Sequence, residues 1–319
     1  MKMKGSGWIL RSAIGVIFLG AVACFFGFKF FNNNVEGIST EKPIPVAMAL
    51  DDGYVYPTIV SMTSMLENAS PNRKLDFYVM HPGEFKDENK QKLKSLEGKY
   101  VNCSVNLINM QDKYKNAYDK GHITTPTYYR LSLSDLLPHI DKTIWLDGDT
   151  LTFCDLGEMY NLDMKGLYYR GFWDAYADKL DHYICAGVML INLELLRKDN
   201  MTEKFDKFIA DHPDKIDHHD QDVINFTCSE KIGKLPPKFG MFNRYDSPYL
   251  DSNNVGEYVD AFKLKERYTK EEMADGYDNI GVLHCVYKPW KYPDVPFRDV
   301  WWLYARKTDF YKEIKERVV

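Results

Sequence analysis

The 319-residue sequence lacks an excess of positive charge. Its 41 lysine and arginine residues are outnumbered by 46 aspartate and glutamate residues, which gives a formal net charge of -5. The two signs are interspersed, and no basic stripe with interleaved aromatic residues occurs. Because nucleic-acid binding depends on clustered lysine and arginine, the composition argues against nucleic acid as a partner.

Closely spaced cysteines, internal repeats and low-complexity segments are also lacking. The six cysteines are scattered and form no C-x-x-C spacing. Neither a zinc site nor a disulfide framework is therefore indicated, although one or two bridges stay open. With 45% hydrophobic residues, the chain is long enough to bury one large core or two modest ones.

Hydrophobic residues form a long run near the N-terminus. The stretch 12–31 carries Lys29 as its one charge and is about long enough to cross a bilayer. Basic residues are denser before the run than after it, which favours a cytoplasmic N-terminus. We expect a short tail at 1–11, a transmembrane signal-anchor at 12–31 and a stem at 32–43. A cleaved signal peptide is the alternative, because 21–23 resembles a cleavage site.

Strand and helix patterns alternate in the rest of the chain. Alternation of this kind is typical of βαβ crossovers and predicts an α/β fold, a mainly parallel sheet flanked by helices, over 44–298. The tail 299–319 is expected to form one amphipathic helix that docks on this domain or contacts a membrane. Strands are expected at 46–50, 75–80, 101–107, 143–146, 166–173, 186–193 and 281–284, and helices at 56–68, 84–99, 128–137, 205–211 and 221–228.

The strongest chemical signal is the stretch 143–149, where a hydrophobic strand leads into Asp147-Gly148-Asp149. At strand spacing the two carboxylates point to the same side, and the glycine between them lets a bulky group approach. Oxygen ligands held in this way suit Mn²⁺ or Mg²⁺, which in turn suits a diphosphate. A lone acid-x-acid triplet is more often a solvated turn, so the prediction depends on the accompanying motifs.

Several motifs accompany the triplet in a fixed order. Together they resemble the motifs of the family 8 glycosyltransferases, retaining enzymes of the GT-A fold, and the resemblance covers most of the predicted domain. The accompanying motifs are Asp51-Asp52-Gly53-Tyr54, Tyr129-Arg130-Leu131, Cys185-Ala186-Gly187-Val188, Asp220-Gln221-Asp222, and His284 followed by Lys288-Pro289-Trp290.

This resemblance implies transfer of a hexose or pentose from a UDP-sugar to a hydroxyl of a glycan, lipid or protein, with retention of configuration. The acceptor would be a glycan, a glycolipid or a glycoprotein, and a homodimer stays open. The resemblance also implies Mn²⁺ (or Mg²⁺) held by Asp147, Asp149 and His284. A cation there would neutralise charge as it develops on the departing diphosphate.

Roles for the other site residues follow from the same resemblance. Gln221 is nearest in motif position to a nucleophile, but an amide is a poor one, so we favour attack on the face shielded by the diphosphate. The neighbouring His218 and His219 are expected at the surface. Nucleotide-sugar binding is expected of Asp51, Asp52, Tyr54, Arg130, Asp147, Gly148 and Lys288, and catalysis on the sugar side of Arg130, Asp174, Asp220 and Gln221.

Two departures from the family pattern keep other functions open. Cys185 stands where the family has asparagine, and the loop after His284 is short and lacks a glycine. A catalytically impaired GT-A protein that binds a glycan or a partner is therefore the alternative. A nucleotidyltransferase is a weaker rival, because 51–54 does not provide a glycine-rich, lysine-bearing phosphate loop.

The expected membrane anchor and the expected UDP-sugar donor together restrict the cellular location. A cytoplasmic N-terminus places the domain across the membrane, which in a eukaryote means a Golgi-type lumen supplied with UDP-sugars. A bacterial periplasm has no such supply, so in a bacterium we expect the opposite topology with the catalytic domain facing the cytoplasm.

Overall fold

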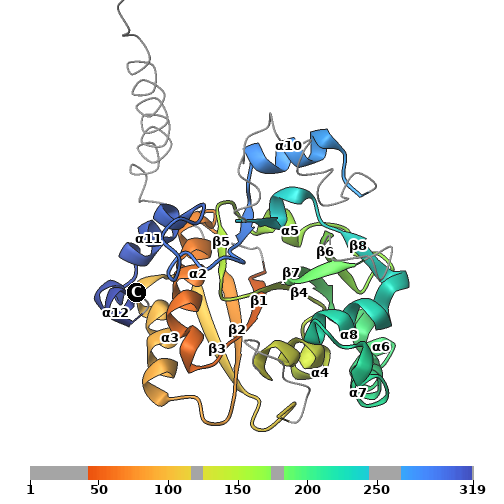
Figure 1. The fold of residues 1–319 in the computed structure, drawn as a ribbon. Coiled ribbons are helices and arrows are strands. Elements are labelled where there is room, and N and C mark those ends of the chain that lie inside the picture. Colours follow the sequence, from red (N-terminus) through yellow and green to blue (C-terminus); the bar gives the residue numbers. More distant parts are fainter. Residues whose placement is uncertain (1–41, 116–124, 174–182, 244–266, 318–319) are drawn as a thin grey trace, which may run out of the picture. The chain divides into compact units, whose positions relative to one another are not determined.

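The computed structural model describes residues 42–115, 125–173, 183–243 and 267–317 (Figure 1). The expected anchor at 12–31 and the site candidate Asp174 both lie outside these ranges. Within the ranges, no helix has both the length and the apolar character needed to cross a membrane. The anchor therefore stays a prediction.

A seven-stranded sheet forms the centre of the described part, in the order β3-β2-β1-β4-β7-β6-β8. β7 runs antiparallel to β4 and β6, whereas the other neighbours pair in parallel. The predicted mainly parallel α/β sheet is thus confirmed. The strands are β1 (Ile44–Ala49), β2 (Leu75–His81), β3 (Cys103–Asn109), β4 (Lys142–Leu146), β6 (Tyr169–Trp173), β7 (Ile184–Asn192) and β8 (Ile232–Lys234).

A small second sheet in the described ranges joins distant parts of the chain, in the order β5-β10-β9. It contains β5 (Thr150–Thr152), β9 (Met241–Phe242) and β10 (Val282–His284). β10 pairs antiparallel with β5, and His284 lies opposite Thr150. This register places His284 beside the acid triplet that ends at Asp149.

Helices flank the main sheet. In Figure 1, α2 and α3 lie beside β1–β3, whereas α6, α7 and α8 gather near β7. α2 is buried along almost its whole length, because β5, α11 and α3 all pack against it. The helices are α2 (Val55–Asn68), α3 (Asp87–Lys99), α4 (Leu133–Leu136), α5 (Gly157–Tyr160), α6 (Leu193–Lys198), α7 (Met201–Asp211), α8 (His219–Cys228), α10 (Lys270–Asp278), α11 (Arg298–Lys307) and α12 (Tyr311–Arg317).

Two predicted helices differ from the structure. Over 128–137 the chain forms a 3₁₀ segment, Thr125–Ser132, followed by the single turn of α4. The tail forms two helices instead of one, because Thr308 has an extended backbone and its hydroxyl accepts a hydrogen bond from Phe310 N. The tail docks on its own domain, as Trp301 is buried 5.1 Å from the ring of Trp290.

Candidate functional site

A cavity of about 430 Å³ opens where β1, β4 and β7 meet the β10 loop and the start of α8. Ten of the predicted site residues line it, so the sequence motifs lie together in space. They are Asp51, Tyr54, Arg130, Asp147, Gly148, Asp149, Asp220, Gln221, His284 and Lys288.

Asp52, the neighbour of Asp51, is not among the lining residues. Its carboxylate accepts hydrogen bonds from Asn89 Nδ2 (2.6 Å) and Lys86 N (3.2 Å) at the start of α3. The neighbouring Asp51 does line the cavity, and it caps the 3₁₀ turn by accepting from Gly53 N. The turn therefore directs the two adjacent acids to different places, and Asp52 holds α3.

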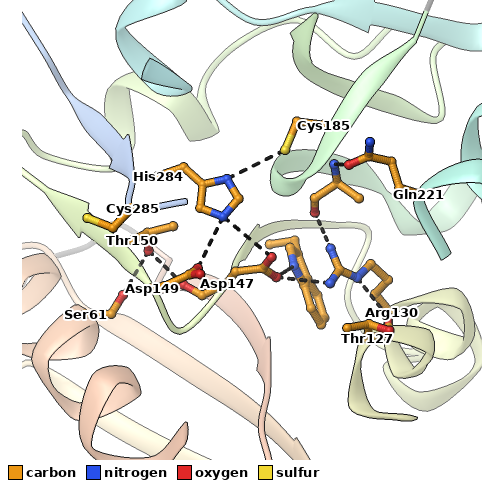
Figure 2. Close-up of polar contacts among 12 residues, drawn as sticks. Ser61, Thr127, Arg130, Asp147, Asp149, Thr150, Cys185, Gln221, His284 and Cys285 are labelled. Carbon is orange, nitrogen blue, oxygen red and sulfur yellow. Dashed lines mark hydrogen bonds and ion pairs between the residues drawn. The ribbon is translucent and has the colours of Figure 1, made fainter. Parts of the chain in front are cut away.

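Asp147, Asp149 and His284 converge at one wall of the cavity (Figure 2). One ligand atom from each lies within 4.8 Å of the others. His284 Nε2 is 3.2 Å from Asp149 Oδ1 and 3.9 Å from Asp147 Oδ2. Asp149 Oδ1 is buried and accepts no well-aligned hydrogen bond within the described residues. A buried carboxylate oxygen without a hydrogen-bond donor is suited to bind a cation.

Each of the three residues has a second polar atom that faces away from the cluster and contacts another side chain. Asp147 Oδ1 accepts hydrogen bonds from Trp145 Nε1 (2.8 Å) and Arg130 (3.1 Å). Asp149 Oδ2 pairs with the Lys288 ammonium, and His284 Nδ1 contacts the Cys185 thiol. Outer partners of this kind orient metal ligands, and two carboxylates with one imidazole suit Mn²⁺ or Mg²⁺.

Charge in this cluster is balanced within the protein. Burial alone would raise the pKa of Asp149, but the positive charges of Lys288 and His284 hold it well below its usual range. Burial likewise opposes protonation of His284, yet Asp149 raises the pKa of His284 to about 10. Because a histidine must be neutral to bind a metal, a cation bound here would displace a proton from His284.

Gly187 of β7 leaves room for the cluster. A Cβ at this position would overlap His284 Cε1 and lie 2.8 Å from His284 Nδ1 and 2.9 Å from Asp147 Oδ2. Contacts that short force the ring or the carboxylate to move. We expect Gly187→Ala to weaken Mn²⁺ binding by at least about tenfold, as for other disturbed ligand shells. Electron paramagnetic resonance of free Mn²⁺ measures this, with Gly98→Ala as the matched control, because a Cβ at Gly98 meets nothing within 4 Å.

Arg130 connects Asp147, a metal-binding candidate, to Asp220 at the start of α8. Its side chain is 4% exposed, lies 2.9 Å from Asp220 Oδ2 and 3.1 Å from Asp147 Oδ1, and stacks on the Trp145 ring at 4.3 Å. The Nε that lies beside Asp220 donates its hydrogen bond to the carbonyl oxygen of Thr127, and Nη1 donates to the carbonyl oxygen of Ala186. The guanidinium is therefore directed at protein groups and fixes the two carboxylates.

Asp220 and Gln221 begin α8 and face the cavity. Burial raises the pKa of Asp220 to about 6, although the Arg130 charge lowers it in part. Gln221 Oε1 accepts a hydrogen bond from Ala186 N at 2.9 Å, which ties α8 to β7. The amide therefore has a structural partner on the strand that carries Gly187.

The two neighbouring histidines behave differently from each other. His218 is exposed and lines the cavity, as a surface residue can. His219 was expected at the surface but is buried against Tyr128, with their ring centroids 6.1 Å apart. A backbone φ of 52° at His219, in the left-handed region, turns this side chain inward.

Lys288 and Tyr54 form the side of the cavity next to Asp149. Burial raises the pKa of the Tyr54 hydroxyl well above its usual range, and the nearby Lys288 ammonium lowers it in part. The Tyr54 ring meets Trp290 edge to face at 6.0 Å. This places an ammonium and an aromatic ring together beside the candidate metal ligands.

Residues 45–294 match the model of glycosyl transferase family 8. The match spans most of the chain. The chain belongs to glycosyl transferase family 8. It is therefore a glycosyltransferase, as the order of its motifs predicted.

Similar proteins agree with this membership. General stress protein A of Bacillus subtilis (strain 168) is 27% identical over 283 residues, which cover 82% of this family 8 chain and 93% of that protein. Lipopolysaccharide 1,2-glucosyltransferase of Escherichia coli is 26% identical over 233 residues, covering 68% and 67%. The structure of the galactosyltransferase LgtC in complex with donor and acceptor sugar analogs has a TM-score of 0.64 at 19% identity, covering 86% and 95%. The fold is thus GT-A-like.

Proposed function

We propose that this glycosyltransferase moves a hexose or pentose from a UDP-sugar to a hydroxyl of a glycan, lipid or protein, with retention and with Mn²⁺ or Mg²⁺. The observation that carries the proposal is the convergence of Asp147, Asp149 and His284 on one cavity wall, with Lys288 beside them. When bound there, the cation would supply positive charge against the departing diphosphate.

The chain's own residues would bind and orient the donor. The Lys288 ammonium is a compact positive charge that can contact a phosphate oxygen. Asp51 lines the cavity near Tyr54, where a carboxylate can accept from a ribose hydroxyl and a ring can pack on a base. Gly148 lets the acid triplet pack closely against α2, because a Cβ there would overlap Thr58 Oγ1.

Retention is best served by attack on the face from which the diphosphate leaves. The acceptor oxygen then bonds to the anomeric carbon as the bond to the phosphate oxygen breaks, and the hydroxyl proton passes to that phosphate oxygen. The geometry of Gln221 supports this route, because its Oε1 is engaged by Ala186 N. An amide so engaged is a poor nucleophile.

The decisive experiment is UDP release by the full-length protein in detergent across a panel of UDP-sugars, with Mn²⁺ and then with EDTA. We expect release with one sugar, lost in EDTA, which would also identify the donor. Absence of both release and UDP-sugar binding would favour the alternative, a GT-A protein that binds a glycan or partner without transfer. The replacement of the family's asparagine by Cys185 is the observation that favours that alternative.

The membrane and the acceptor form a further part of the proposal. The apolar run at 12–31 supports a single-pass anchor, with the domain in a Golgi-type lumen in a eukaryote or facing the cytoplasm in a bacterium. The similarity to a lipopolysaccharide glucosyltransferase supports a lipid-linked glycan as acceptor. Protease protection of sealed vesicles tests the topology, and cleavage on the side opposite to the one proposed for the source would contradict it.

A further inference from the structure

Cys185 and His284 are in contact inside the cavity. Cys185 Sγ lies 3.6 Å from His284 Nδ1, and each residue is only 7% exposed (Figure 2). The cysteine is near the start of β7, a strand buried on both faces, so its position is fixed by the main sheet. The histidine comes from β10 of the small sheet. The contact therefore joins two sheets at the proposed metal site.

The contact is on the side of the imidazole that faces away from the two acids. Nε2 is directed at Asp149 and Asp147, whereas Nδ1 is directed at the thiol. An imidazole that gives its Nε2 lone pair to a cation carries its proton on Nδ1. That N–H needs an acceptor, and among the described residues the structure supplies Cys185 Sγ.

We propose that Cys185 is a positioning residue for the metal ligand His284. Its sulfur accepts the Nδ1–H of His284 and holds the ring with Nε2 toward Asp149 and Asp147. Metal-bound histidines are oriented in this way by a carboxylate, a carbonyl or a water, and here a thiol takes that place. The inference rests on the proposed metal-dependent function. It gives a role to Cys185, the residue that replaces the family's asparagine.

The other two ligands support this assignment by comparison. Asp147 is held by Trp145 and Arg130, and Asp149 by Lys288, each on the oxygen that faces away from the cluster. Without Cys185, the histidine would be the one ligand lacking such a partner among the described residues. Gly187, on the same strand as Cys185, leaves room for the ring in this orientation, since a Cβ there would overlap His284 Cε1.

The test is the Mn²⁺ affinity of the full-length protein, measured by electron paramagnetic resonance of free Mn²⁺. Cys185→Ala removes the acceptor, so we expect binding to weaken by about tenfold. Cys185→Ser keeps an acceptor and should restore binding close to the wild-type value. Cys228→Ala is the matched control, because Cys228 is an equally buried thiol whose sulfur contacts Thr227.

The outcomes separate this inference from the proposed function. Unchanged Mn²⁺ affinity in Cys185→Ala would overturn the positioning role and leave the metal site standing. Equal weakening in Cys185→Ser and Cys185→Ala would also overturn it, because a cavity alone would then explain the loss. If the wild-type protein binds no Mn²⁺, the metal-dependent function and the inference both fail. Thermal unfolding in EDTA verifies that each variant is folded.

Discussion

Asp149→Asn is expected to reduce sugar transfer by roughly a thousandfold, because removing a metal ligand costs several kcal/mol of transition-state stabilisation. The substitution keeps the size of the side chain and removes its charge. The carboxylate now lies between His284 Nε2 at 3.2 Å and the Lys288 ammonium. With asparagine, the Lys288 ammonium would lose its carboxylate partner in a buried site, and His284 would keep only the more distant Asp147 carboxylate at 3.9 Å among the described acids. Both the metal affinity and the turnover number should therefore fall.

Asp52→Asn is the matched control for this prediction. It makes the same chemical change in another acid of the predicted site, but the carboxylate of Asp52 binds Asn89 and Lys86 at the start of α3. Turnover in Asp52→Asn should stay close to the wild-type value. UDP release at saturating donor and Mn²⁺ measures both variants. Comparable losses in the two would contradict the assignment of the metal site to the triplet after β4.

Much of the fold could be predicted from the sequence. Alternating strand and helix patterns predicted the parallel strands, and the apolar run 186–193 predicted the buried β7. The ends of the elements were harder to predict. Thr308 divides the tail into two helices, although the amphipathic pattern continues across it. Hydrophobic periodicity records which face is buried, but a local hydrogen bond decides where a helix ends.

The acids at strand ends predicted the site, because such ends meet at one edge of a parallel sheet. The position of His284 depends on the pairing of β10 with β5, a contact between distant segments that spacing does not encode. Trp145 was missed because it reads as a core strand residue. Its position two before Asp147 was an available signal, since alternate strand residues share a face. The burial of His219 could not be predicted in this way, because it depends on a left-handed backbone conformation at a residue other than glycine.

Arg130→Met is expected to lower the free energy of unfolding by about 3–5 kcal/mol, the usual result of breaking a buried ion pair from one side. Methionine fills a similar volume but leaves two carboxylates unbalanced. Asp220 is 4% exposed, and its Oδ2 accepts no hydrogen bond within the described residues, so it depends on the guanidinium 2.9 Å away. Urea unfolding of the full-length protein measures the effect. Arg306→Met, at an exposed position of α11, should change stability by less than about 0.5 kcal/mol.

A second substitution and a change of pH test the cause of that loss. Asp220→Asn removes the unbalanced charge, so the double variant should recover about 1–3 kcal/mol relative to additive effects. Burial already raises the pKa of Asp220 to about 6 while Arg130 is present, and losing Arg130 removes the charge that lowers it. A folded pKa above the unfolded one stabilises the fold at low pH, and this contribution is lost as the pH rises through the folded value. The defect of Arg130→Met should therefore be larger at pH 8 than at pH 5. A defect of the same size at both pH values would mean that ionised Asp220 is not its source, and that packing on Trp145 is what Arg130 chiefly supplies.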